Sequence, residues 1–122
     1  MSPLLFVTLS VAGGLGGVTR FSVDQAIKAK LGQAFPWSTF TINVTGSFLL
    51  GLLTGLVLTE IASPSLQLVL GTGFLGGYTT FSTASHETVT LMRERKYTRA
   101  LTYSLGTLIV STAAALLGLM LV

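Results

Sequence analysis

The 122-residue sequence lacks cysteine and carries little charge, and these two shortages exclude several classes of protein. Without cysteine there is no disulfide, no cysteine-ligated metal and no thiol nucleophile. Asp, Glu, Lys and Arg make up 9% of the residues, against about 25% in soluble domains. Seven basic and four acidic side chains are too few to cover the surface of a soluble domain this small. The composition therefore predicts an integral membrane protein.

Enzymatic and nucleic-acid-binding functions have little support in the sequence. It contains no phosphate-binding loop, no Ser/His/Asp arrangement and no carboxylate pair. Its one histidine, His86, does not make a zinc site alone, and we assign it no role. The net charge of +3 is too small and too unevenly placed to indicate nucleic acid. We therefore expect neither an enzyme nor a nucleic-acid partner.

Charged residues divide the chain into four uncharged segments, at 3–19, 31–59, 61–85 and 100–122. A helix that crosses about 30 Å of hydrocarbon needs roughly 20 apolar residues. The pattern predicts an all-α membrane protein with four transmembrane helices in a single unit, residues 1–122. We expect the first helix to continue past Arg20 toward Ile27. The second begins near Pro36, with Trp37 as an interfacial anchor.

The connections between the predicted helices differ in charge. A Ser-Pro-Ser triplet at 63–65 follows the second helix, and an Arg-Glu-Arg-Lys run at 93–96 follows the third. The first and third connections carry six basic residues, which are Lys28, Lys30, Arg93, Arg95, Lys96 and Arg99. The opposite side, with both termini and the middle connection, carries Glu60 and no basic residue. By the positive-inside rule, the first and third connections are cytoplasmic and both termini are outside.

Glycine is concentrated in the first and third predicted helices. The residues concerned are Gly13, Gly14, Gly16 and Gly17, then Gly71, Gly73, Gly76 and Gly77. In the first helix we interpret them as sites of close helix packing. In the third, the Gly-Gly-Tyr-Thr-Thr run at 76–80 predicts a helix broken in mid-membrane. Such breaks present carbonyls to cations and helix N-termini to anions.

Asn43 and Phe81 each have a structural and a functional interpretation. The Asn43 amide is costly in hydrocarbon unless it is hydrogen-bonded, so it either joins two helices or donates into a pore. Phe81 directly follows the expected break. Its ring is either part of the packing or presents its electropositive edge to an anion.

Hydroxyl and charged side chains complete the candidate residues. Hydroxyls on the third and fourth helices form a candidate polar track, at Ser82, Thr83, Ser85, Thr107 and Ser111. The usual alternative is that such hydroxyls bond to carbonyls of their own helix. Arg20 and Asp24 stand four residues apart, which permits an ion pair, or Arg20 draws anions to a vestibule.

Three strings of the sequence resemble the CrcB/Fluc family of fluoride channels. They are GGLGGVTRF at 13–21, TFTINVTG at 39–46 and GTGFLGGYTTFST at 71–83. The resemblance covers the whole chain, and it implies an antiparallel dimer in a bacterial cell membrane, with two fluoride pores. It also implies passive export of fluoride, which protects the cytoplasm.

The resemblance implies a role for each candidate residue. Matches to the pore are Asn43, Phe81, Ser82, Thr83, Ser85, Tyr103, Thr107 and Ser111. Arg20 matches an arginine near the aqueous vestibule, and Glu87 matches the acidic residue that follows the aromatic positions. Gly76 and Thr79 match positions whose backbone carbonyls hold a structural sodium ion at the dimer centre.

The chain departs from the family pattern in two ways. Ala84 stands where the family has a second phenylalanine, and the loop charges are one-sided instead of balanced. Both favour pairing with a related chain of opposite orientation over a homodimer, in which case one of the two pores is non-conducting. Two other functions compete with a channel. A small four-helix multidrug exporter needs an intramembrane carboxylate, which the first helix lacks before Asp24. A non-conducting partner subunit leaves the polar residues unexplained.

Overall fold

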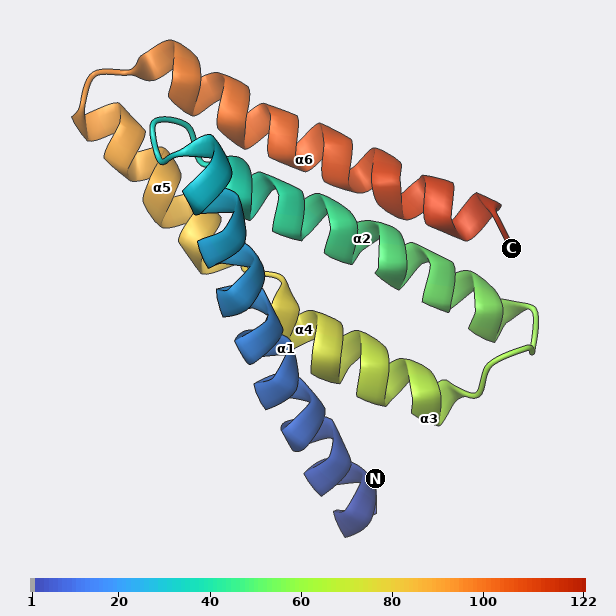
Figure 1. Cartoon of the computed structure of the whole chain (residues 1–122). Coiled ribbons are helices and arrows are strands. Elements are labelled where there is room, and N and C mark those ends of the chain that lie inside the picture. The colour runs from blue at the N-terminus through green and yellow to red at the C-terminus, as the bar shows by residue number, and fades with distance from the viewer. Residues whose placement is uncertain (1) are drawn as a thin grey trace.

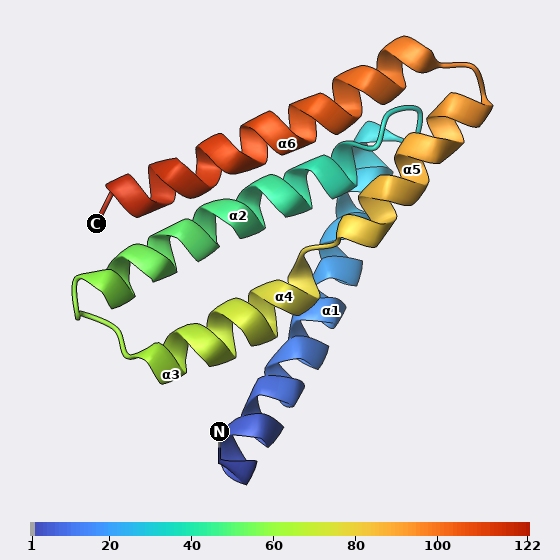
Figure 2. The same ribbon diagram turned by 180° about the vertical axis from the view of Figure 1, so that it is seen from behind.

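The computed structural model describes residues 2–122, and within that range all regular structure is helical. The elements are α1 (Pro3–Leu31), α2 (Trp37–Leu58), α3 (Pro64–Leu66), the π-helix η1 (Gln67–Leu75), α4 (Gly76–Tyr78), α5 (Phe81–Arg93) and α6 (Tyr97–Met120). α2 and α6 lie side by side, and α1 crosses the chain and packs against η1 and α4 (Figures 1 and 2). The connections at 32–36 and 94–96 lie together at one end, while both termini and the connection at 59–63 lie toward the other (Figure 1).

The sequence predicted most helix boundaries correctly. α1 runs past Arg20 without interruption to Leu31, and α2 begins directly after Pro36. The Ser-Pro-Ser triplet ends the connection after α2, because the Ser63 hydroxyl accepts a hydrogen bond from the backbone N–H of Leu66 (3.2 Å) and caps the next helix. The run at 93–96 forms the turn before α6.

Within residues 2–122, three helices, α1, α2 and α6, are long and apolar enough to span a membrane. The third predicted helix is not continuous, since it is divided into α3–η1–α4 and α5. Thr79 and Thr80 separate the two parts in extended conformations, with ψ of 159° and 115°. The interruption expected at 76–80 is therefore present. The nine-residue π-helix before it was not expected from the sequence.

Glycines allow α1 to contact η1 and α4 through their backbones. A Cβ atom at Gly16 would clash with the carbonyl of Phe74, and one at Gly77 would clash with the carbonyl of Gly13. The packing interpretation of the glycines is thus confirmed for the inward face of α1. Gly14 and Gly17 differ, since a Cβ at either would meet no atom within 4 Å.

Large apolar side chains cover the outside of the molecule. Phe6 is 60% exposed, Val18 64% and Leu108 64%. The buried clusters are small and gather around Ile42 and Tyr103. A chain with so much exposed apolar surface is suited to a lipid environment, in agreement with the composition.

We predict that Gly16→Ala destabilises the fold, since the added methyl group meets backbone that has no flexible end to move. Overpacking of this kind costs about 1–3 kcal/mol. The measurement is thermal unfolding of the purified chain in detergent, with Gly106→Ala of α6 as the control, since a Cβ atom there would meet no atom within 4 Å. Equal melting temperatures for the two variants would contradict the packing described above.

Candidate functional site

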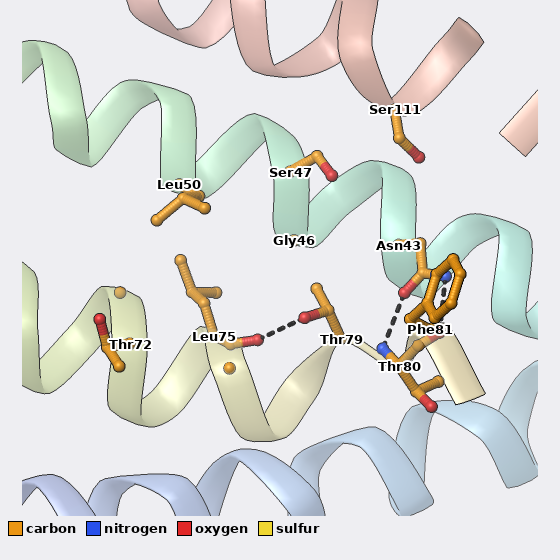
Figure 3. A pocket seen from close by; sticks show the side chains of 12 residues that line it. Asn43, Gly46, Ser47, Leu50, Thr72, Leu75, Thr79, Thr80, Phe81 and Ser111 are labelled. Carbon is orange, nitrogen blue, oxygen red and sulfur yellow. Dashed lines mark hydrogen bonds between the residues drawn. The ribbon is translucent and has the colours of Figure 1, made fainter. Parts of the chain in front are cut away.

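Asn43 of α2 bridges the interruption between α4 and α5. Its amide Nδ2 donates to the carbonyl oxygen of Thr80 (3.0 Å), and the Thr80 N–H donates to Asn43 Oδ1 (2.9 Å) (Figure 3). One side chain thus replaces both partners that the Thr80 backbone loses where the helix stops. Of the two interpretations of Asn43, a hydrogen bond between helices is confirmed.

The interruption also leaves two carbonyl groups without their helical donors. In a continuous helix, the N–H groups of Thr80 and Thr83 would bond to the carbonyls of Gly76 and Thr79. Here the Thr80 N–H donates to Asn43, and the Thr83 N–H donates to Thr80 Oγ1 (3.2 Å). The carbonyls of Gly76 and Thr79 are therefore free of these bonds.

A cavity of about 470 Å³ lies beside the interruption. Its lining comes from α2, η1, α4, α5 and α6, through Asn43, Gly46, Ser47, Leu50, Gly71, Thr72, Leu75, Gly76, Thr79, Thr80, Phe81 and Ser111. Ser111 points from α6 toward Asn43 and Phe81 (Figure 3). The Phe81 side chain is 86% exposed, so the ring belongs to the edge of the cavity and not to the packed interior. The structure thus brings together five of the predicted residues.

Phe81 also lines a second hollow, between α5 and α6. This groove of about 360 Å³ is formed by Phe81, Ala84, Ser85, Thr88, Val89, Tyr103, Ser104 and Thr107. It contains three further predicted residues and the alanine that replaces the second phenylalanine. Phe81 is common to both hollows, so they adjoin at this side chain.

Two hydroxyl groups on α6 have no hydrogen-bond partner in the described residues. Thr107 Oγ1 and Ser111 Oγ are both buried and unpaired. Bonding to a carbonyl of the same helix, the usual arrangement, does not occur at these two positions. It does occur at Thr112, whose Oγ1 donates to the carbonyl of Leu108 (2.7 Å). The hydroxyls of Ser111 and Thr112, which are adjacent in α6, therefore differ in their hydrogen bonding. Those of Thr107 and Ser111 remain available to another group.

The expected hydroxyl track on α5 is not continuous. Ser85 lines the groove toward α6, whereas Thr83 lines a separate pocket of about 160 Å³ beside α1. Ser82 is exposed, and its Oγ lies 3.4 Å from Thr80 Oγ1. Ser82 and Ser85, three residues apart, lie on neighbouring parts of the helix surface, whereas Thr83 points about 100° away from Ser82.

The charged candidate residues contact groups that the sequence did not suggest. Arg20 does not pair with Asp24; its Nε donates instead to the carbonyl of Gly77 (3.2 Å). Asp24 pairs with Lys28 (3.1 Å), in the more favourable order in which the acid precedes the base by four residues. Glu87 accepts a hydrogen bond from the Tyr103 hydroxyl (3.2 Å).

The sequence did not single out Thr80, although it is central to the site. Its backbone bonds to Asn43, and its hydroxyl caps α5 and donates to Thr83 Oγ1 (3.0 Å). A threonine directly before a predicted helix is a common cap, so the residue type carried a usable signal. Ser38, which donates to Asp24, was also missed.

The model of the CrcB-like protein family (Camphor Resistance, CrcB) matches residues 7–119. The chain belongs to the CrcB family. Several bacterial members named as fluoride-specific ion channels are similar to it over almost their full length. Fluoride-specific ion channel FluC 1 of Leifsonia xyli subsp. xyli is 47% identical over 99% of this chain and 88% of the relative.

Two further CrcB relatives carry the same kind of name. Fluoride-specific ion channel FluC 1 of Ligilactobacillus salivarius is 45% identical over 92% of this chain and 94% of the relative. Fluoride-specific ion channel FluC of Thermus thermophilus is 38% identical over 93% of this chain and 90% of the relative. The resemblance drawn from the three sequence strings is therefore confirmed.

We predict that Asn43→Ala opens the interruption, because it leaves the N–H and the carbonyl of Thr80 without a side-chain partner. The expected loss is about 2 kcal/mol or more of unfolding free energy, with faster amide hydrogen exchange at Thr80. Thr41→Ala is the matched control on α2, since it shortens a nearby polar side chain and leaves both bonds between Asn43 and Thr80 in place. Unchanged exchange at Thr80 in Asn43→Ala would show that the amide does not hold the interruption.

Proposed function

We propose that this chain is a subunit of a fluoride-selective channel in a bacterial cell membrane, through which fluoride leaves the cytoplasm passively. The observation that carries the proposal is the pair of buried, unpartnered hydroxyls at Thr107 and Ser111, in a CrcB-family chain whose relatives are named as fluoride channels. The two hollows beside them meet at Phe81.

The chemistry of the hollows fits a small, strongly hydrated anion. Such an ion leaves water only if close donors replace its hydration shell. Thr107 and Ser111 have O–H groups free to donate, Asn43 has a second amide hydrogen, and Phe81 presents an electropositive ring edge. Among the described residues, those that line the two hollows include neither Lys nor Arg. A pore without a fixed positive charge holds the anion weakly enough for it to leave.

In this proposal the chain crosses the membrane four times. α1, α2 and α6 each form one crossing, and α3–η1–α4 together with α5 forms the remaining one, with its interruption in mid-membrane. The grouping of both termini at one end of the molecule supports this topology (Figure 1). The six basic residues at the other end support a cytoplasmic location for the first and third connections.

A second subunit in antiparallel orientation completes the pore in this proposal. The exposure of Phe81 and of the outward face at Gly14 and Gly17 supports it, since these groups have no covering partner within the described chain. Ala84 and the one-sided loop charges favour a related chain of opposite orientation over a second copy. If the second subunit is such a related chain, one of the two pores is non-conducting.

A sodium ion at the centre of the pair fits the carbonyls at the interruption. Gly76 and Thr79 present carbonyl oxygens that have lost their helical donors, and oxygen is the ligand that hard cations prefer. Two such pairs, one from each subunit, would hold the ion. It would supply a structural link between the subunits, and it takes no part in permeation.

The multidrug-exporter alternative has no support from the acidic residues. Asp24 contacts Lys28 and Ser38, and Glu87 contacts Tyr103. Neither carboxylate lines the two hollows that meet at Phe81. The non-conducting-subunit alternative rests on Ala84, which lines the α5–α6 groove without a ring edge to offer.

Fluoride efflux from liposomes tests the proposed function directly. Liposomes that contain only this chain are followed with a fluoride electrode, with chloride as the control ion. Fluoride efflux without chloride efflux shows a self-sufficient homodimer. Efflux that needs co-reconstitution with a related chain of opposite orientation shows the paired form. Absence of fluoride efflux in both preparations would contradict the proposal.

Substitutions on α6 test the role of the free hydroxyls. We expect Thr107→Val and Ser111→Ala each to reduce fluoride flux by roughly tenfold, the change that follows loss of one hydrogen bond to a charged group. Thr112→Val is the matched control, because the Thr112 hydroxyl already bonds to Leu108. A reduction in the control as large as in the other two would show that the effect is not specific to the unpartnered hydroxyls.

A further inference from the structure

The side chains of α1 near its basic end compete for one carboxylate. Asp24 has a base on either side at a distance of one helical turn, Arg20 before it and Lys28 after it. In the structure Lys28 Nζ binds Asp24 Oδ2 (3.1 Å), and the hydroxyl of Ser38 donates to Asp24 Oδ1. Both carboxylate oxygens are therefore occupied by groups other than Arg20.

Ser38 is well placed to hold the Asp24 carboxylate in this position. It lies in the first turn of α2 and is only 3% exposed, so its hydroxyl is held in the contact between α1 and α2. The side chains of Asp24 and Lys28 are 22% and 35% exposed, so their ion pair is partly shielded from water. Partial burial strengthens an ion pair relative to an exposed one.

Arg20 remains free to bind the interruption. Its Nε donates to the carbonyl of Gly77, in the last turn before the chain leaves the helix at Thr79. The carbonyls at a helix C-terminus lack donors and carry partial negative charge, so a guanidinium is a favourable partner there. Arg20 also lines the pocket that contains Thr80 and Thr83. The guanidinium thus joins α1 to the segment that Asn43 caps from the other side.

We propose that Lys28 and Ser38 are positioning residues for conduction, because they occupy Asp24 and so keep Arg20 on the Gly77 carbonyl at the interruption. If Lys28 is removed, Asp24 turns to the base one turn earlier and draws Arg20 away from Gly77. The interruption then loses a charged hydrogen bond, and the positive charge beside it is neutralised. This inference rests on the proposed function, because it explains how the proposed pore keeps its geometry.

A second substitution tests the competition for Asp24. Lys28→Met should lower fluoride efflux from liposomes by roughly tenfold, the change expected for loss of one charge-assisted hydrogen bond. Lys28→Met combined with Asp24→Asn should restore most of the flux, since the competing negative charge is gone. Because Asp24→Asn would also relieve an unpaired carboxylate in a purely structural ion pair, the position of Arg20 is measured separately to distinguish the two roles.

Lys30→Met provides the matched control, since it removes the same charge from the same end of α1 without touching Asp24. Its flux should equal that of the unsubstituted chain. The ¹⁵N resonance of the Arg20 Nε–H group, assigned by comparison with Arg20→Lys, provides a readout that needs no transport. It should shift in Lys28→Met and return in the double variant.

The outcomes distinguish this inference from the proposed function. Normal flux in Lys28→Met, failure of the double variant to recover, or an equal loss in Lys30→Met would each overturn the positioning role. If the unsubstituted chain carries no fluoride, alone or with a partner, the proposed function fails. The Arg20 resonance then still decides whether Lys28 keeps Asp24 away from Arg20.

Discussion

The two hydrogen bonds between Asn43 and the backbone of Thr80 are the constraint on which the site depends. An interrupted helix inside a membrane exposes an N–H and a carbonyl that find no water, and each unsatisfied group is costly. Asparagine carries a donor and an acceptor in one planar group, so one side chain satisfies both. Aspartate would lack the donor and leucine would lack both. Thr79 and Thr80 can therefore stay extended because α2 carries an amide at this level.

The interruption determines where the neighbouring elements go. α5 leaves the direction of η1 and α4 and continues toward the start of α6 (Figure 2). Phe81, as its first residue, is thereby placed at the edge of two hollows instead of inside one helix contact. Because of the same interruption, the carbonyls of Gly76 and Thr79 lose their helical N–H donors. The carbonyl of Gly77 accepts a hydrogen bond from Arg20. The interruption is one local change of conformation. The position of the two hollows, the free carbonyls and the contact with the Arg20 guanidinium all follow from it.

The sequence predicted the features that depend on residue type, such as the helix boundaries and the interruption. It did not predict which of several possible partners a side chain binds. The interruption, the start of α2 after Pro36 and the long first helix followed from glycine, proline and the spacing of charges. The π-helix at 67–75 did not follow from these signals. The Arg20–Asp24 pair, one of the two alternatives for Arg20, does not form, and spacing alone does not show that Lys28 and Ser38 already bind the carboxylate. The sequence selected Thr107 and Ser111 for the polar track, but it did not show that their hydroxyls are unpaired while that of Thr112 is paired.

The strongest physical argument for an ion path along α6 is that the hydroxyls of Thr107 and Ser111 are unpaired while that of Thr112 is paired. A threonine in a helix satisfies its hydroxyl at little cost by bonding to the carbonyl one turn earlier, as Thr112 does. A buried hydroxyl that forgoes this bond costs about 1–3 kcal/mol unless another group takes its place. Thr107 and Ser111, one turn apart, both forgo it and lie beside the hollows that Phe81 joins. An anion or water in those hollows would recover the cost at both positions, and packing alone would recover it at neither.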